Sequence, residues 1–126
     1  CFTPFNQILA LSENDSEDSN YERLQENRNR LNYAKNTNGK QFDIIEIHQP
    51  TYREFLNERM PLSYINFYMA NRSIIIPIFN DPRDKKAIET ISNIFQDRIV
   101  IPIEGLSIVE GGGGIHCITQ QQPATN

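Results

Sequence analysis

The sequence predicts an α/β fold made of repeated strand and helix units. Two stretches of the chain each contain a strand, an acidic loop, a helix and a strand, and their apolar positions correspond: Leu9 matches Ile75, and Ile45 matches Val100. A chain of 126 residues is long enough for one domain with one modest core. We therefore expect a single domain that contains two units. Their approximate ranges are 1–60 and 61–126.

The first copy begins with a strand over residues 6–12, where side chains alternate in character. An acidic run, ENDSED at 13–18, leads to a helix that we expect to be capped by Ser19, because Glu22 follows at the capping-box spacing. Four residues should share one face of this helix: Tyr21, Leu24, Leu31 and Ala34. The turn TNGK ends the helix, and FDIIEI at 42–47 is predicted as the next strand.

The second copy begins with two predicted strands, SYINFYMA at 63–70 and SIIIPIF at 73–79. A helix follows, for which Asp81 is the expected N-cap residue and Pro82 the first helical residue. RIVIPI at 98–103 is predicted as a further buried strand. The inward face of the helix should carry Ala87, Ile88, Ile91, Ile94 and Phe95.

Two prolines stand at matching places in the two apolar runs, Pro77 and Pro102. Each lacks the N–H that a strand ladder needs, so each favours an edge strand or the end of strand pairing. We expect both to mark places where strands leave a sheet.

Charge and hydropathy limit the classes of partner. The 12 Lys and Arg residues against 16 Asp and Glu give a net charge of -4, and no basic cluster is present that could follow a phosphate backbone. A small cationic ligand suits such a protein, and so does ordinary solubility. The longest apolar runs are far shorter than the ~20 residues of a membrane span. We therefore expect neither nucleic acid nor a membrane as a partner.

The start of the chain and its cysteines give weaker indications. The sequence begins CFTPFNQ, without Met and without the pattern of a signal peptide, so we expect a fragment. Cys1 and Cys117 are too few for a disulfide framework or a structural zinc site, which favours a cytoplasmic location. The ENDSED run is expected to face solvent, with no metal bound.

The motif EGGGGIHCITQQQP at 110–123 is the part of the sequence from which function can be argued. Its glycines are Gly111, Gly112, Gly113 and Gly114. Without Cβ atoms this backbone can adopt positive φ and approach a ligand closely, although a flexible connector is the alternative. Cys117 follows in IHCIT, which is predicted as a short strand. Cys117 is either a small buried apolar residue or a nucleophile whose thiolate is stabilised by backbone dipoles.

Neither histidine is an obvious base for Cys117. His116 is its neighbour on an extended chain, and neighbouring side chains of a strand point to opposite faces. His48, at a strand end, is expected to be a surface or interface imidazole. Asn66 and Tyr68 should share a strand face, where Asn66 either contacts a substrate or makes a structural hydrogen bond.

Three stretches, SYINFYMAN, SIIIPIFNDPRDKKAIETISNIF and GGGGIHCITQQQP, resemble the C-terminal part of agmatine deiminases, the guanidine-hydrolysing branch that also contains bacterial peptidyl-arginine deiminases. NYERLQENRNRL and FDIIEI fit the same pattern, so the resemblance runs from about Ile8 to Pro123. It implies a pentein fold, a fivefold pseudosymmetric propeller of ββαβ units, of which this chain would form about two. It also implies that Cys117 is the nucleophile.

The resemblance further implies which groups the chain lacks. In the family, a Gly-His-x-Asp motif with the general base precedes the strand equivalent to residues 6–12, and other acidic residues and a Trp-Asp pair lie nearer the N-terminus. Missing N-terminal modules of the same protein would therefore be partners, as would further copies in a homo-oligomer. Leu11 replaces a common aromatic residue and Gly114 replaces Asn or Ser, and these departures bear on the choice of substrate.

The implied reaction is hydrolysis of agmatine to N-carbamoylputrescine and ammonia, a step of putrescine biosynthesis that needs no metal or other cofactor. CITQQQP is closer to the agmatine branch, but peptidyl-arginine deimination remains an alternative. A second alternative is a binding or assembly module in which Cys117 is buried and inert. We expect the isolated chain to be inactive and to associate through its apolar flanks.

Overall fold

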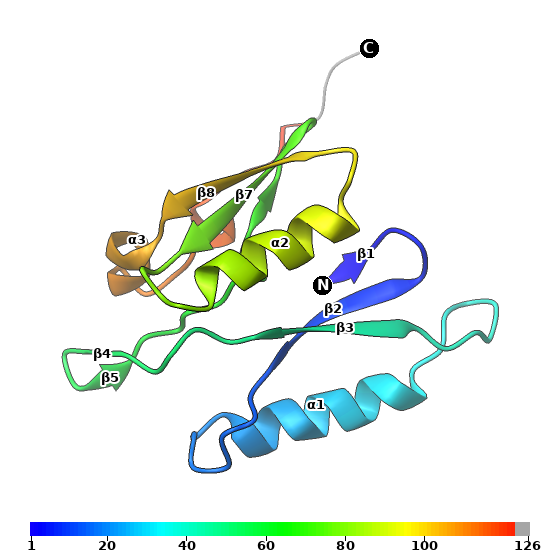
Figure 1. The fold of residues 1–126 in the computed structure, drawn as a ribbon, viewed down its shortest axis with the longest axis horizontal. Coiled ribbons are helices and arrows are strands. Elements are labelled where there is room, and N and C mark those ends of the chain that lie inside the picture. Colours follow the sequence, from blue (N-terminus) through cyan, green and yellow to red (C-terminus); the bar gives the residue numbers. More distant parts are fainter. Residues whose placement is uncertain (123–126) are drawn as a thin grey trace.

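Figure 1 shows the protein as a computed structural model, which describes residues 1–122, so that Pro123 lies outside the described part. The first unit consists of β1 (Phe2–Thr3), β2 (Gln7–Ser12), α1 (Tyr21–Tyr33) and β3 (Asp43–His48). The second consists of β6 (Tyr68–Met69), β7 (Ser73–Ile78), α2 (Asp84–Ile94) and β8 (Ile99–Glu104). In each unit an antiparallel strand pair is followed by a helix and a parallel strand. The predicted α/β fold of repeated ββαβ units is confirmed.

The two sheets have the same strand order, β1-β2-β3 and β6-β7-β8. In the first sheet Leu9 lies opposite Ile45, and in the second Ile75 lies opposite Ile101. The predicted match of Ile45 with Val100 is therefore displaced by one residue. The internal repeat itself is present, with the helix of each unit connecting two parallel strands.

One hydrophobic core joins the two units, and α2 lies between the two sheets (Figure 1). Leu9 and Ile47 of the first sheet belong to the same buried cluster as Ile74, Ile76 and Ile91 of the second unit. The predicted inward face of α2 is confirmed: Ala87, Ile91, Ile94 and Phe95 are buried, and Ile88 is partly buried against them. A shared core fixes the position of one unit relative to the other.

The first helix, α1, is more exposed than α2. Its predicted inward residues are only half-buried, and α1 contains no fully buried residue. Ser19 is not its cap: α1 follows Asn20, and the Ser19 hydroxyl accepts a hydrogen bond from Arg59 at 2.8 Å. The helix starts one residue later than predicted and has no side-chain cap, so the predicted capping box does not form.

The start of α2 also differs from the prediction. The helix begins at Asp84, and Pro82 lies in the turn before it. Asp81 accepts N–H bonds from Arg83 at 2.9 Å and from Thr51 at 2.8 Å. It therefore organises the turn and the nearby connection, and the carboxylate of Asp84 accepts the Asp81 N–H at 2.9 Å.

Exposure distinguishes the two proline-containing strands. β8 is an edge strand with Ile99 70% exposed and Ile101 42% exposed, so the prediction of a buried strand is wrong. Pro102 lies on this edge, as expected for a residue that cannot donate to a ladder. Pro77 is buried in the central strand β7, but it lies beyond the short stretch that pairs with β6.

Several connections were not predicted. Most of SYINFYMA is irregular, and only β6 within it forms a strand. The connection between the units contains a hairpin, β4 (Glu54–Phe55) and β5 (Glu58–Arg59), whose turn holds Leu56 and Asn57 at positive φ. Asn tolerates this conformation, but Leu-Asn is a weaker turn signal than Asn-Gly. No helix among the described residues has the length and apolar character needed to cross a membrane.

The acidic run does not simply face solvent. Glu13 is 3% exposed, and its carboxylate accepts the N–H groups of Asn14 and Asp15 and the side-chain amide of Gln49 at 2.9 Å. Burial opposes ionisation, but these hydrogen bonds outweigh it and hold the pKa of Glu13 below its usual value. The run is thus a folded loop that connects the first unit to residues between the units.

Candidate active site

The glycine run follows α3 (Leu106–Glu110), and at two of its residues the absence of a side chain matters. Gly112 has φ +89°, which residues with a side chain rarely adopt. A Cβ at Gly114 would lie 2.6 Å from the Cγ of Asn66, so Asn66 or the turn would have to move to admit a side chain there. At Gly114 the backbone therefore lies close to the Asn66 side chain. The predicted close approach to a ligand stays a prediction.

Cys117 lies in the short 3-10 helix η1 (His116–Ile118), so the prediction of a strand over IHCIT is wrong. The turn closes because the N–H of Cys117 donates to the carbonyl of Gly114 at 3.0 Å. The glycines allow the chain to turn back within three residues, which an extended run would not do. Cys117 is exposed, as a nucleophile requires.

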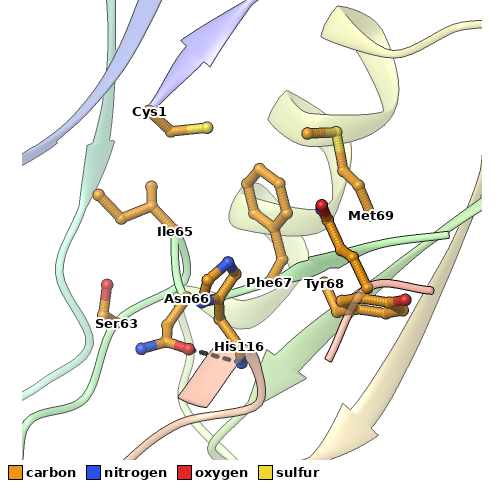
Figure 2. Close-up of a pocket in the computed structure, with 9 residues that line it drawn as sticks. Cys1, Ser63, Ile65, Asn66, Phe67, Tyr68, Met69 and His116 are labelled. Atoms are coloured by element: carbon orange, nitrogen blue, oxygen red, sulfur yellow. Dashed lines mark hydrogen bonds between the residues drawn. The ribbon is translucent and has the colours of Figure 1, made fainter. Parts of the chain in front are cut away.

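Asn66 connects this turn to the segment before β6. Its Oδ1 accepts the backbone N–H of His116 at 2.8 Å, the bond drawn in Figure 2. Its Nδ2 lies 3.6 Å from the Sγ of Cys117 and can donate to the sulfur. Asn66 was predicted either to contact a substrate or to make a structural hydrogen bond. The structure gives it the hydrogen bonds, and substrate contact stays a prediction.

The surroundings of the thiol favour its ionised form. Hydrogen bonding from the backbone of Gly114, followed by that from the Asn66 side chain, holds the pKa of Cys117 below its usual value. The thiolate is the nucleophilic form of cysteine, so a lowered pKa raises its fraction at neutral pH. Backbone and amide dipoles supply this effect, and no nearby cation is needed for it.

A pocket of about 360 Å³ lies beside this turn (Figure 2). Asn66 and His116 line it, and so does Tyr68, although Asn66 precedes β6 and the two do not share a strand. The full lining is Cys1, Ser63, Ile65, Asn66, Phe67, Tyr68, Met69, His116 and Gln121. Neither Cys117 nor any of the four glycines lines this pocket, so contact of the glycines with a substrate remains a prediction.

The structure places no base on the thiol. Within residues 1–122, neither imidazole makes a hydrogen bond to the Cys117 sulfur. His48 is exposed and lies 3.1 Å from the amide of Asn14, as expected for a surface imidazole. His116 belongs to the same turn as Cys117, and its backbone N–H is held by Asn66. The described part of the chain also shows no cluster of three or more metal-binding side chains.

Some members of this site could not be read from the sequence. Cys1 lines the pocket from the opposite end of the chain, and Tyr64 and Asp84 hold the segment that carries Asn66. No local pattern joins residues so far apart in sequence. The signal that was available is the glycine run, because several consecutive glycines indicate a close approach of the backbone.

Known proteins are similar to this chain in sequence and in fold. A protein of Legionella pneumophila that carries the provisional name agmatine deiminase is 43% identical over 121 residues, covering 95% of this chain and 35% of that protein. The agmatine deiminase of Medicago truncatula is 38% identical over 144 residues, covering 98% of this chain and 38% of that protein. The solved agmatine deiminase of Enterococcus faecalis superposes with a TM-score of 0.86 at 25% identity, covering 94% of this chain and 37% of that chain.

The chain thus spans about a third of the length of the relatives that it matches. These figures say how much of each relative is matched but not which part of it. The expected place of this chain in the C-terminal part therefore stays a prediction. The solved deiminases identify the fold of the two units as part of a pentein. Residues 1–123 match the model of the Porphyromonas-type peptidyl-arginine deiminases. On this match and these relatives, the chain belongs to the agmatine deiminase and peptidyl-arginine deiminase family.

Proposed function

We propose that the chain is part of an agmatine deiminase in which Cys117 is the nucleophile. The observation that carries this proposal is an exposed thiol whose pKa is lowered by the Gly114 backbone and by Asn66. Relatives named agmatine deiminase support the choice of agmatine as the substrate. The net charge of -4 is compatible with a cationic substrate.

The proposed reaction has two steps. The Cys117 thiolate attacks the central guanidinium carbon and a C–S bond forms. One amino group of this carbon gains a proton, its C–N bond breaks and it leaves as ammonia, so that a thiouronium remains on the enzyme. A water then adds to the thiouronium carbon and the C–S bond breaks, which gives N-carbamoylputrescine and restores the thiol. A covalent intermediate divides one difficult displacement into two easier ones.

In this proposal the other groups of the site orient the reactants. The Asn66 amide favours the thiolate and directs the sulfur, and the glycine turn leaves room for a flat guanidinium beside it. Carboxylates that grip the guanidinium and the base that activates water come from parts of the protein outside these 126 residues. No metal or other cofactor takes part in the proposed chemistry.

Of the two alternatives, one has specific support and the other does not. Peptidyl-arginine deimination is favoured by the description of the matching family model. It needs a site open to a peptide backbone, whereas agmatine ends in a free amine. A binding module with an inert Cys117 would need a buried thiol, and the exposure of Cys117 argues against it.

The test is a comparison of substrates with the whole polypeptide that contains this sequence. Ureido product is measured from agmatine, from free arginine and from a peptide with blocked ends and one internal arginine. We expect agmatine to be preferred by at least about a hundredfold in kcat/KM, since a site shaped for the amine rejects a peptide backbone. A preference for the peptide would replace the proposal by the first alternative, and no product from any of the three would favour the binding module.

A further inference from the structure

The segment that carries Asn66 has little regular backbone structure. Residues 61–67 contain no helix or strand. Two local bonds hold its backbone, from the N–H of Leu62 to the carbonyl of Met60 at 2.8 Å and from the N–H of Asn66 to the carbonyl of Ser63 at 3.3 Å. A third, longer bond runs from the N–H of His116 to the carbonyl of Asn66 at 3.4 Å. A segment with so few backbone bonds depends on its side chains for a fixed position.

Two aromatic side chains attach this segment to α2 on either side of Asn66. Tyr64 is fully buried, and its hydroxyl donates to the Oδ1 of Asp84, the first residue of α2, at 2.8 Å. Phe67 packs edge-on against Phe95, directly after the last residue of α2, with ring centroids 6.0 Å apart. Asn66 is therefore held between the two ends of one helix.

Asp84 is a rigid acceptor for Tyr64. Its carboxylate also accepts the N–H groups of Phe79 at 3.2 Å and Asp81 at 2.9 Å. Burial, and then the hydrogen bond to Asp84, raise the pKa of Tyr64 far above its usual value. The hydroxyl therefore stays protonated and remains a donor throughout the working pH range.

The contacts of Asn66 leave it little freedom. Its side chain lies so close to Gly114 that a single added Cβ would overlap it at 2.6 Å. The same side chain bonds to the backbone N–H of His116 and to the Cys117 sulfur. If the Asn66 side chain moved by a few tenths of an ångström, it would either lengthen its bonds to His116 and Cys117 or press against Gly114.

We propose that Tyr64, through its hydrogen bond to Asp84, positions Asn66 and thereby orients the Cys117 thiol. Tyr64 is a positioning residue, because it acts through Asn66 and does not itself contact the sulfur. The inference rests on the proposed function in one respect, namely that Cys117 is the nucleophile. It adds a buried tyrosine that is distant from the cysteine in the sequence to the groups that set thiol reactivity.

The test compares Tyr64→Phe with wild type in the whole polypeptide. The variant keeps the ring and removes one hydroxyl, and Tyr33→Phe is the matched control because Tyr33 is 82% exposed. The rate of iodoacetamide alkylation is followed against pH on the peptide that contains Cys117, separately from Cys1. For Tyr64→Phe we expect the curve to move to higher pH and the rate at neutral pH to fall about threefold to tenfold, the size of one hydrogen bond.

The activity readout should agree with the alkylation curve. We expect kcat for agmatine to fall by about the same factor with little change in KM, because orientation of the thiol matters in the chemical step. Asp84→Asn keeps Tyr64 but replaces a charged acceptor by a neutral one, so it should move the curve in the same direction by less. Tyr33→Phe should coincide with wild type in both measurements.

An alkylation curve that is unchanged in both Tyr64→Phe and Asp84→Asn would overturn the inference, even if thermal stability fell. A loss of stability alone would make Tyr64 a structural residue. If the wild-type polypeptide makes no product from agmatine, the proposed function fails, and the alkylation curves still decide the inference. A shifted curve then supports positioning of the thiol, and an unshifted curve rejects it.

Discussion

Gly114 is the residue at which a single added atom should disable the site. The Cβ of Gly114→Ala would lie 2.6 Å from Asn66, so Asn66 or the Cys117 turn must move. A displacement near 1 Å can lower turnover about a hundredfold, and we expect a loss of that order in ureido production. Circular dichroism should still show a folded protein.

Gly111→Ala is the control for this variant. Gly111 has φ −76°, which alanine adopts readily, and an added Cβ would meet the carbonyl of Ile108 at 3.2 Å. We expect it to retain most of the activity. Equal losses in the two variants would mean that the loop responds to any side chain and that the contact with Asn66 has no special role.

The pKa of Cys117 should depend on the amide of Asn66. The amide donates to the sulfur and favours the thiolate, so its removal in Asn66→Ala raises the pKa. Since alkylation follows the thiolate fraction, its curve should move to higher pH and the rate at neutral pH should fall. Asn29→Ala, on the exposed face of α1, should leave the curve in place. If the alkylation curves of Asn66→Ala and Asn29→Ala coincide, the Asn66 amide does not influence the pKa of Cys117.

The acidic loop and the connection between the units are joined through Glu13. Its folded-state pKa lies below the usual value, so its contribution to stability is present above pH of about 4.3 and is lost as the pH falls through the folded pKa. At pH 7 we expect Glu13→Gln to lower the free energy of unfolding by about 1 to 3 kcal/mol, because buried N–H groups lose a charged acceptor.

The difference between this variant and wild type should shrink as the pH falls below about 4.3 toward about 3, since Glu13 gains a proton in the unfolded chain before it does in the folded one. Urea unfolding at the two pH values measures it. Glu17→Gln removes an exposed carboxylate from the same loop and should change little at either pH. If the difference in unfolding free energy between Glu13→Gln and wild type stays constant with pH, the charge of Glu13 does not contribute to stability.

Regular elements were the predictable part of this fold. β2, β3, β7 and α2 agree with the sequence within about one to three residues, because apolar periodicity identifies a face that must be buried. The prediction that Ser19 caps the first helix was wrong: the helix follows Asn20, and the Ser19 hydroxyl accepts a hydrogen bond from Arg59, 40 residues away in the sequence. The turn around Cys117 was also missed: it is closed by a local bond from the Cys117 N–H to the Gly114 carbonyl, but Asn66, from another segment, accepts the N–H of His116 in the same turn. Partners that are distant in sequence leave no local pattern.

Among the candidate site residues, Cys117 and Gly114 were identified from the sequence because their chemistry is distinctive. A thiol and a run of residues without Cβ atoms are unusual in any context. Asn66 was identified with two possible roles, and only its contacts in space distinguish them. Tyr64 was not singled out from the sequence, because its link to Asp84 depends on how α2 packs.

The outer face of β8 should govern how this chain associates on its own. Ile99 and Ile101 are exposed on an edge strand, and such an edge favours pairing with other chains. We expect the 126-residue chain to elute from size-exclusion chromatography as oligomers. Ile99→Lys should shift it toward the monomer, whereas Asn93→Lys adds the same charge on α2 and should not. A compact monomer for the unchanged chain would contradict this expectation.

The 126-residue chain alone should yield no ureido product from agmatine, since the base and the guanidinium-binding carboxylates lie outside it in the proposed mechanism. The decisive comparison therefore uses the whole polypeptide with agmatine, as wild type and as Cys117→Ala, with the ureido product measured by colour. We predict product from wild type and none above background from Cys117→Ala, because the covalent step needs the thiolate. Product formation that survives the loss of Cys117 would contradict the assignment of the nucleophile.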